Sequence, residues 1–400
     1  MKRIVVIGAG QAGASLVAKL RGLGFAGEIT LIGAEPVPPY QRPPLSKAYL
    51  LGEMALERLF LRPESFYADH GIDLRLGQRV TAIDRAARTV ALGDDVLPYD
   101  ALALTTGSVP RRLPALIGGD LRGVHLVRDL ADVDAMGPRF QTGAKAIIVG
   151  GGYIGLEAAA VAAKKGLEVT VLEMAPRILQ RVAAPETSDA IRALHQAHGV
   201  TILEATGLER IEGATRVEGV SLSDGRRLEA DFVIAGIGIL PDTALAEATG
   251  LTLENGIRTD TQGRTSDPHI WAAGDCASFP WRGELLRLES VQNAIDQAEL
   301  VAENMLGAGK DYAPVPWFWS DQYDLKLQIA GLNTGYDRVI VRTGDARSHW
   351  YFAGEKFLAV DALNDPRAFM VGKRLLEQGK SPDPVLLADT ATDLKQLLKA

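Results

Sequence analysis

Two stretches of the chain share one order of apolar and polar positions. Residues 4–7 form a continuous apolar run rich in β-branched side chains, and after a glycine-rich turn residues 14–20 follow with helical period. Residues 147–149 and the alanine-rich segment after residue 155 repeat this order. Continuous short apolar runs are typical of strands buried on both faces, so the pattern predicts parallel sheets covered by helices.

Each turn carries three glycines in the spacing G-x-G-x-x-G. They are Gly8, Gly10 and Gly13 in the first copy and Gly150, Gly152 and Gly155 in the second. The first glycine permits a tight turn, the second lets backbone N–H groups approach a pyrophosphate, and the third allows close packing of helix on strand. The N-terminus of the following helix then faces the phosphates. The pattern therefore predicts two dinucleotide sites.

An acidic residue follows the second strand of each copy, about 20 residues after the last glycine. These residues are Glu35 and Glu173, and a carboxylate there accepts hydrogen bonds from ribose hydroxyls. Because a carboxylate repels a 2'-phosphate, Glu173 favours NADH over NADPH at the second site. Arg177 could receive that phosphate, but we interpret it as a solvated surface arginine.

Composition and charge exclude several classes of protein. The 400 residues are 47% hydrophobic and 23% charged, as in globular domains, and the net charge of -7 argues against a general nucleic-acid binder. Cys276 is the single cysteine and is predicted to be a buried small side chain. His195 and His198 lack a third ligand at suitable spacing, so we predict no metal site and two partly charged histidines at a helix C-terminus. No apolar stretch approaches the ~20 residues of a membrane span, and we expect a cytoplasmic protein.

The pattern changes after residue 316. Alternating strands are predicted around 326–330, 338–342 and 357–361, with Gly354 in a hairpin turn and a helix that Asp365 caps. Trp317 and Trp319 alternate on one face of an earlier strand, which by itself indicates a core face. Before the change, Ser290 is predicted to cap a helix over 291–305. The C-terminal part is therefore predicted to be an α+β domain.

These motifs resemble the FAD-dependent NADH:ferredoxin reductases that supply bacterial cytochromes P450 and ring-hydroxylating dioxygenases. The matches span nearly the whole chain: V-V-I-G-A-G-Q-A-G at 5–13, P-Y-Q-R-P-P-L-S-K at 39–47, L-A-L-T-T-G at 102–107, I-I-V-G-G-G-Y-I-G-L-E at 147–157, V-I-A-G-I-G-I-L-P at 233–241, T-S-D-P-H-I-W-A-A-G-D at 265–275, L-E-S-V-Q-N-A at 288–294 and W-F-W-S-D-Q-Y at 317–323. The chain departs from the family at Ala34, where an aspartate is common, which affects the number of adenosine-ribose contacts.

The resemblance implies an α/β fold with two doubly wound dinucleotide-binding domains, one inserted in the other, plus the C-terminal α+β domain. The expected boundaries are 1–110 and 245–316 for the FAD domain, 111–244 for the NADH domain and 317–400 for the C-terminal domain.

The resemblance also implies roles for individual residues. Lys47 is expected beside the flavin N5 edge, paired with Glu157, and Trp319 is expected to shield the ring or to lie on the electron exit side. The residues expected to bind FAD are Gly8, Gly10, Ala12, Gly13, Glu35, Arg42, Lys47, Val80, Arg128, Asp275 and Val291. Those expected to bind NADH are Gly150, Gly152, Tyr153, Ile154, Gly155, Glu173, Gly236 and Gly238. Read from the residues alone, Asp275 is equally well a turn aspartate. Gly236 and Gly238 indicate a backbone that lies against something flat, with a slack turn as the alternative.

The implied activity is hydride transfer from NADH to FAD and then single-electron transfer to a [2Fe–2S] ferredoxin. The ferredoxin would bind transiently and be steered by charge, and the candidate docking residues are Lys326, Arg338, Lys373 and Arg374. We expect a monomer or weak homodimer that binds neither nucleic acid nor membrane. Two alternatives remain: another acceptor, such as rubredoxin, a quinone or monodehydroascorbate, or an NADH-sensing flavoprotein that acts by binding partners.

Overall fold

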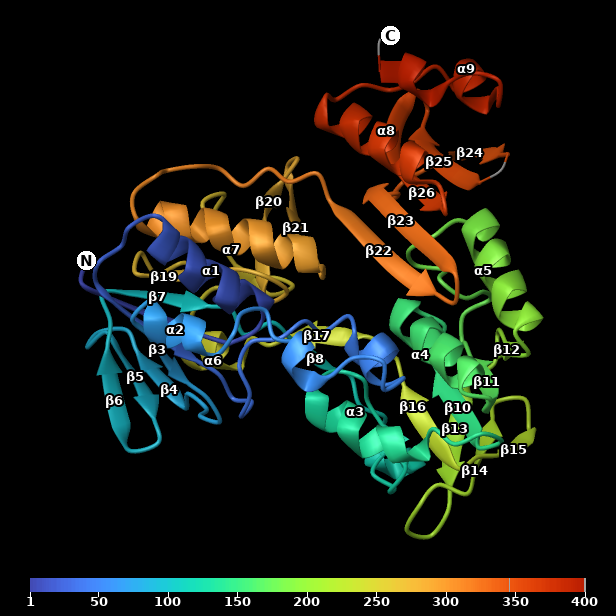
Figure 1. The fold of residues 1–400 in the computed structure, drawn as a ribbon, viewed down its shortest axis with the longest axis horizontal. Helices are drawn as coiled ribbons and strands as arrows, with labels where there is room; N and C mark the ends of the chain where they lie inside the picture. Colours follow the sequence, from blue (N-terminus) through green and yellow to red (C-terminus); the bar gives the residue numbers. More distant parts are fainter. Residues whose placement is uncertain (345, 399–400) are drawn as a thin grey trace. The chain divides into compact units, whose positions relative to one another are not determined.

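The computed structural model describes residues 1–344 and 346–398, which fold into two compact units (Figure 1). Unit one consists of Met1–Gln41, Ala55–Val109 and Ile239–Pro314. Unit two consists of Arg42–Met54, Pro110–Gly238 and the chain from Val315 onward. The expected boundaries of three domains stay a prediction, since the presumed NADH and C-terminal domains share unit two.

Unit one is built on a parallel sheet of five strands. In sheet order these are β19 (Ile270–Ala272), β7 (Ala101–Leu104), β1 (Arg3–Ile7), β2 (Glu28–Ile32) and β3 (Ile72–Arg75). Helices α1 (Gln11–Gly22) and α7 (Val291–Met305) lie side by side and share one hydrophobic core with the sheet (Figure 1). The central strand β1 is apolar on both faces because both faces are covered.

Smaller elements complete unit one. The short helices are α2 (Ser65–Asp69) and α6 (Ala244–Ala248), with a helical turn at Leu56–Arg58. One small sheet contains β4 (Ala82–Asp84), β5 (Thr89–Leu92) and β6 (Asp95–Pro98). A second contains β18 (Ile257–Arg258), β20 (Ala277–Trp281) and β21 (Glu284–Leu286). Strand β17 (Ile239–Pro241) pairs with β8 (Ser108–Pro110).

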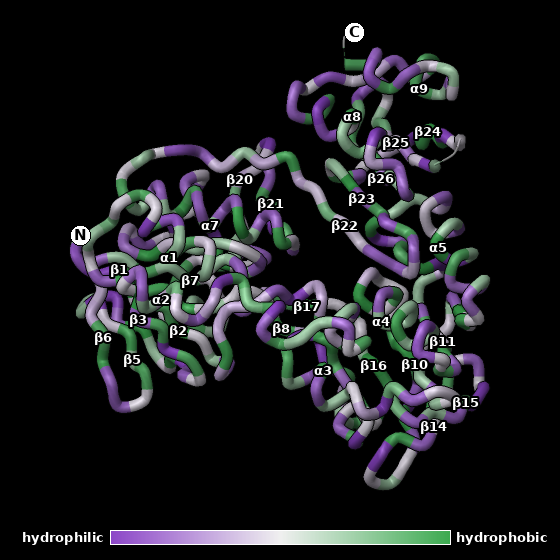
Figure 2. The backbone as a smooth tube through the Cα atoms, in the orientation of Figure 1, coloured by the Kyte–Doolittle hydropathy of each residue, from purple (hydrophilic) through white to green (hydrophobic). Residues whose placement is uncertain are grey.

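Unit two repeats the parallel sheet. Its strands, in order, are β12 (Thr201–Leu203), β11 (Glu168–Leu172), β10 (Lys145–Val149), β16 (Phe232–Ala235) and β9 (Val124–His125), and the central ones are hydrophobic (Figure 2). The helices are α3 (Leu130–Met136), α4 (Tyr153–Lys164) and α5 (Pro185–Ala197). A second sheet contains β13 (Leu208–Glu212), β14 (Gly219–Leu222) and β15 (Arg227–Glu229). Short helical turns occur at Leu45–Tyr49, Ala115–Ile117 and Gly137–Arg139.

The C-terminal part of unit two is an antiparallel sheet with helices. Its strands, in sheet order, are β22 (Trp317–Gln322), β23 (Leu325–Gly331), β26 (Lys356–Leu363), β25 (Arg347–Ala353) and β24 (Arg338–Thr343). The helices are α8 (Pro366–Glu377) and α9 (Pro384–Ala388), followed by a turn at Leu394–Leu398. The predicted cap is confirmed, since the Ala368 N–H donates to Asp365 Oδ1 at 2.9 Å. Strand β25 escaped prediction because its buried run R-S-H-W-Y-F-A does not alternate.

The mixed α/β fold class is confirmed by this architecture and by its structural relatives described below. No helix among the described residues is both long and apolar enough to span a bilayer.

Candidate functional site

The first glycine turn joins β1 to α1 and leaves space at its middle glycine. Gly8 has φ +111°, and a Cβ added there would lie 2.2 Å from the Thr105 carbonyl oxygen. A Cβ on Gly13 would lie 2.0 Å from the Gly8 carbonyl oxygen, so helix and strand pack with no room for a side chain. A Cβ on Gly10 meets no described atom within 4 Å. Gly10 is also the N-cap of α1, which no side chain of the described chain caps.

The second turn, between β10 and α4, has the same construction. Gly150 has φ +109°, and its added Cβ would lie 2.3 Å from the Gly236 carbonyl oxygen. A Cβ on Gly155 would lie 2.1 Å from the Gly150 carbonyl oxygen, whereas one on Gly152 meets nothing within 4 Å in the described chain. Each turn thus offers N–H groups at a helix N-terminus and a vacant approach to them, which fits a pyrophosphate.

The two acidic residues after the second strands have different partners. In unit two the Glu173 carboxylate accepts hydrogen bonds from the Gly151 N–H at 2.8 Å and the Ala175 N–H at 2.7 Å. In unit one the Tyr40 hydroxyl donates to the Glu35 carboxylate. Glu173 is therefore held against the second glycine turn through Gly151, while its contact with a ribose stays a prediction.

Other candidates for FAD lie in unit one. The Ser108 hydroxyl donates to Asp275 Oδ2 at 2.9 Å, and Ala12 packs 3.1 Å from the Cβ position of Gly274. The predicted helix cap is confirmed, because the Asn293 N–H donates to Ser290 Oγ at 3.1 Å, and Val291 begins α7. Val80 is buried in the core on the other face of the sheet.

Cys276 is buried, as predicted, and burial raises the pKa of its thiol. It therefore serves as a small core side chain.

An ion pair between a half-buried lysine and a buried glutamate lies in unit two. Lys47 Nζ is 3.1 Å from Glu157 Oε1 and 3.4 Å from Asp321 Oδ2. The Glu157 carboxylate also accepts from the Ser320 hydroxyl at 2.7 Å and from the Ser46 hydroxyl at 3.4 Å. Burial raises the pKa of Glu157, while the nearby Lys47 ammonium and the bond from Ser320 act in the opposite direction. The predicted pairing of Lys47 with Glu157 is confirmed, whereas their role at a flavin stays a prediction.

Four other residues of unit two are predicted to bind a cofactor: Arg42 and Arg128 for FAD, and Tyr153 and Ile154 for NADH. Arg42 Nη1 donates to the Arg128 carbonyl oxygen at 2.8 Å. The Tyr153 ring contacts the Phe318 ring at a centroid distance of 4.9 Å, and Ile154 beside it is 43% exposed.

Two further glycines border the second turn. A Cβ on Gly236 would lie 3.3 Å from Gly155 Cα, so this glycine permits close approach to the turn. Gly238 has φ +100°, a conformation that favours glycine, at the break between β16 and β17.

Two tryptophans lie on one face of β22, as the alternation predicts. The ring centroids of Trp317 and Trp319 are 5.7 Å apart, and Lys373 Nζ lies 5.5 Å from the centre of the Trp317 ring. Both tryptophans are half-buried. Trp317 also packs against Phe369 of α8 and thus joins the C-terminal core.

The histidine prediction is corrected by the structure. His195 lies in the last turn of α5, as predicted, but it is fully buried, and burial lowers its pKa, so it is not the partly charged side chain that was expected. Its Nε2 lies 2.7 Å from Gln322 Oε1, while the His198 ring stacks on the Tyr323 ring at 3.7 Å. Arg177 is half-buried and donates to the Ser188 hydroxyl at 2.5 Å, so it is also not a purely solvated side chain.

Three residues near the ion pair were not predicted from the sequence: Ser320 and Asp321, which contact it, and Gln322, which bonds to Ser320. The available signal was the S-x-Q alternation within the apolar strand W-F-W-S-D-Q, which turns two polar side chains to a buried face.

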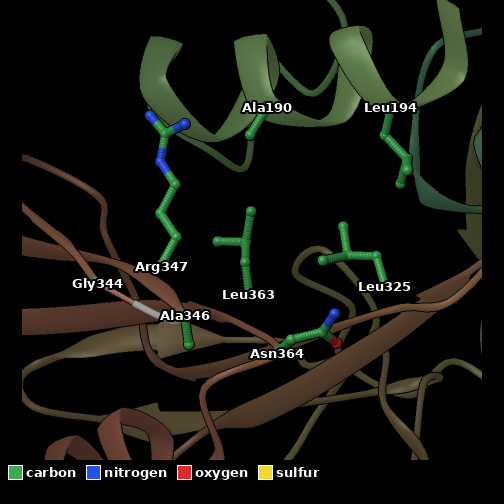
Figure 3. Close-up of a pocket in the computed structure, with 8 residues that line it drawn as sticks. All are labelled: Ala190, Leu194, Leu325, Gly344, Ala346, Arg347, Leu363 and Asn364. Atoms are coloured by element: carbon green, nitrogen blue, oxygen red, sulfur yellow. The ribbon is translucent and has the colours of Figure 1, made fainter. Parts of the chain in front are cut away.

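A cavity of about 400 Å³ lies between α5 and the C-terminal sheet (Figure 3). It is lined by Ala190, Leu194, Leu325, Gly344, Ala346, Arg347, Leu363 and Asn364. All eight lie outside the predicted site, so the cavity contributes nothing to the assignment of a cofactor.

Comparison with known proteins identifies the family. The model of the pyridine nucleotide-disulphide oxidoreductases matches residues 2–298, and that of the reductase C-terminal domain matches residues 317–398. The chain belongs to the pyridine nucleotide-disulphide oxidoreductase family. Within it, the resemblance to ferredoxin reductases of the putidaredoxin reductase type is confirmed, as is membership of an oxidoreductase class.

The relatives are similar over nearly their whole length. Rhodocoxin reductase of Rhodococcus erythropolis is 43% identical over 399 residues, which cover 98% of this chain and 93% of the relative. Putidaredoxin reductase of Pseudomonas putida is 41% identical over 408 residues, with 99% and 97% covered. A crystal structure of putidaredoxin reductase in covalent complex with putidaredoxin has a TM-score of 0.96 and 40% identity, covering 100% of this chain and 98% of that one.

Proposed function

We propose that this chain is an NADH-dependent, FAD-containing reductase that delivers electrons one at a time to a [2Fe–2S] ferredoxin of a cytochrome P450 or dioxygenase system. The observation that carries the proposal is the duplicated glycine turn, at Gly8–Gly13 and at Gly150–Gly155, with open space at the middle glycine of each copy. We call each of these turns, with the start of the helix that follows, a nucleotide cradle. It is supported by full-length similarity to reductases of this kind. A cytoplasmic location is proposed with it, because NADH is available there.

FAD, when bound, supplies the conversion between two-electron and one-electron transfer. The proposed FAD residues of unit one are the first glycine turn, Glu35, Asp275 and the N-terminus of α7. The Ser290 cap orients the free N–H groups of α7, and a helix N-terminus stabilises negative charge placed against it. Arg42, Lys47 and Arg128 are the other residues proposed to bind FAD, and Lys47 is paired with Glu157.

NADH is assigned to the second glycine turn. The Glu173 carboxylate already accepts two backbone N–H groups, which fixes its position below the loop. A 2'-phosphate placed there would meet a like charge in a partly desolvated position, so NADPH should bind more weakly. No proton transfer by a catalytic acid or base is needed for the exchange of hydride between two aromatic cofactors, and the protein supplies orientation.

Ferredoxin docking is proposed on the C-terminal part. Lys373 lies over Trp317, whose ring is next to Trp319, so a positive charge and two aromatic rings are neighbours. Lys326, Arg338 and Arg374 are the other proposed docking residues. A monomer or weak homodimer suffices for such a transient encounter.

The test is rapid mixing of the purified protein, after its visible spectrum has shown bound flavin. We expect NADH to bleach the flavin absorbance and an oxidised [2Fe–2S] ferredoxin to restore it within the turnover time. A colourless protein that cannot be reconstituted with FAD would refute the assignment of cofactors. A reduced flavin–NAD complex that persists in the presence of ferredoxin would instead favour an NADH sensor, and fast reoxidation by rubredoxin or a quinone alone would favour another acceptor.

A further inference from the structure

A continuous series of hydrogen bonds reaches Glu157 through β22 and α5. The Ser320 hydroxyl donates to Glu157 Oε1 at 2.7 Å, and Gln322 Nε2 donates to Ser320 Oγ at 3.1 Å. His195 Nε2 lies 2.7 Å from Gln322 Oε1, and the Tyr323 hydroxyl lies 3.3 Å from His195 Nδ1. We call Ser320, Gln322, His195 and Tyr323 the donor chain.

The carboxylate of Glu157, at the end of the donor chain, determines the direction of every hydrogen bond in it. An ionised Glu157 can only accept, so Ser320 must donate to it and must accept from the amide nitrogen of Gln322. The amide oxygen of Gln322 then faces His195 and requires an N–H from Nε2. This leaves Nδ1 of a neutral His195 to accept from the Tyr323 hydroxyl. All four donors therefore point toward Glu157, and bonds aligned in this way polarise one another.

Glu157 and most of the donor chain are buried, so these hydrogen bonds replace contacts with water. Ser320 and His195 are fully buried, Gln322 is 1% exposed and Glu157 is 8% exposed. A carboxylate in such surroundings loses its hydration, and hydrogen bonds to the charged form compensate for that loss. Without these bonds Glu157 would remain protonated over a wider range of pH.

Glu157 and His195 are the two groups whose ionisation matters here, and each has few titratable neighbours among the described residues. Around Glu157 they are Lys47 on the Leu45–Tyr49 turn and Asp321 on β22. The titratable groups next to His195 are His198, the residue that follows α5, and the hydroxyl of Tyr323, the residue that follows β22. Burial lowers the pKa of His195 most, the hydrogen bond with Gln322 acts in the opposite direction, and the nearby His198 lowers it further. The net direction is downward, which favours a neutral ring with its proton on Nε2, facing Gln322 Oε1.

We propose that Gln322 and His195 are positioning residues which keep Glu157 ionised and thereby hold the Lys47 ammonium in one place. The proposal rests on the proposed function, which places Lys47 beside the flavin. It adds two residues that lie outside both nucleotide cradles and act only through Glu157. The NADH-driven reduction of the flavin should therefore depend on residues of α5 and β22 that contact no cofactor.

The first experiment is the Gln322→Met variant, which keeps the length of the side chain and removes both ends of the amide. We expect the acidic limb of the pH profile of flavin reduction to move up by about one pH unit, because the charged carboxylate loses support. The kcat at neutral pH should fall several-fold while KM for NADH stays within about twofold, since the nucleotide cradle is untouched. An unchanged acidic limb would overturn the proposal.

A matched set at residue 195 covers the case in which Gln322→Met folds poorly. His195→Phe keeps a ring but removes the donor and should shift the profile in the same direction. His195→Gln retains an N–H that can reach Gln322 and should restore the native profile. Gln196→Ala, at an exposed position of the same helix outside the donor chain, should leave the profile unchanged, and an equal shift in this control would refute the proposal.

An infrared titration separates this proposal from the proposed function. The protonated carboxyl band of Glu157 is assigned by its absence in Glu157→Gln. We expect that band to appear at a pH about one unit higher in Gln322→Met than in the native protein. If NADH fails to reduce the flavin but this shift is present, the proposed function fails and the effect of the donor chain on Glu157 stands. If the two titrations coincide, the donor chain has no such effect.

Discussion

Replacing Asp361 by asparagine should change how the stability of unit two depends on pH. Asp361 is 1% exposed, and its Oδ2 accepts from the Thr187 hydroxyl at 2.7 Å and from the Tyr351 hydroxyl. Its Oδ1 has no hydrogen-bond partner among the described residues. Burial raises the pKa of Asp361 to about 6 from an ordinary value of 3.8. The site therefore joins α5 to β25 and β26 within unit two through a carboxyl group that resists ionisation.

The sign of the effect follows from proton binding. Between about pH 4 and pH 6 the folded state holds a proton on Asp361 that the unfolded state has lost, so this group's stabilisation is present at low pH and disappears as pH rises through 6. A pKa difference of this size corresponds to about 3 kcal/mol of the free energy of unfolding.

A neighbouring histidine contributes with the opposite sign. His349 Nδ1 lies 2.6 Å from the Thr187 hydroxyl, and Arg347 Nε donates to its Nε2 at 2.8 Å. Burial, followed by the charge of Arg347, lowers the pKa of His349 to about 4 from 6.5. Its stabilisation is present above pH 6.5 and is lost as pH falls toward 4, so in the native protein the two groups largely cancel.

The assay is urea unfolding followed by circular dichroism from about pH 4 to about pH 7, taken as the difference between variant and native protein so that other titrating groups cancel. In Asp361→Asn the pH dependence of His349 is no longer cancelled. The free energy of unfolding of this variant, relative to that of the native protein, should therefore rise with pH across that window. In His349→Gln the pH dependence of Asp361 is no longer cancelled, so the free energy of unfolding of this variant relative to the native protein should fall as pH rises. Differences that are flat, or that slope the same way in both variants, would refute this reasoning.

Three other outcomes are expected. Gly13→Ala should weaken FAD retention about tenfold or more, because its Cβ would lie 2.0 Å from the Gly8 carbonyl oxygen, whereas Gly22→Ala on the same helix has space and should retain FAD. Glu173→Ala should narrow the preference for NADH over NADPH by roughly tenfold in kcat/KM, and an unchanged ratio would contradict the role of its charge. Raising the ionic strength should slow reduction of an acidic ferredoxin, and Lys373→Ala should reduce that salt dependence; flat rates in the native protein would remove the docking assignment.

Local sequence determined the elements that frame both cradles. The spacing of the glycines requires a strand, a tight turn and a helix, and the positive φ of Gly8 and Gly150 is a backbone demand that the residue type itself reveals. Ser290 and Asp365 likewise cap the helices predicted for them, because a cap depends only on residues three positions away. These features could be predicted because their physical causes lie within one short segment.

Tertiary structure alone decided which distant side chains share a buried environment. His195, predicted to be partly charged at a helix end, is instead fully buried, so its pKa is lowered, and its partner is Gln322 of β22. Asp361 and Thr187 are far apart in the chain and bond only because α5 packs on the C-terminal sheet. Burial and the identity of hydrogen-bond partners depend on contacts between segments distant in sequence, whereas turns and caps depend on near neighbours. The sequence therefore determined the two glycine turns, and the fold determined the hydrogen-bond network around Glu157.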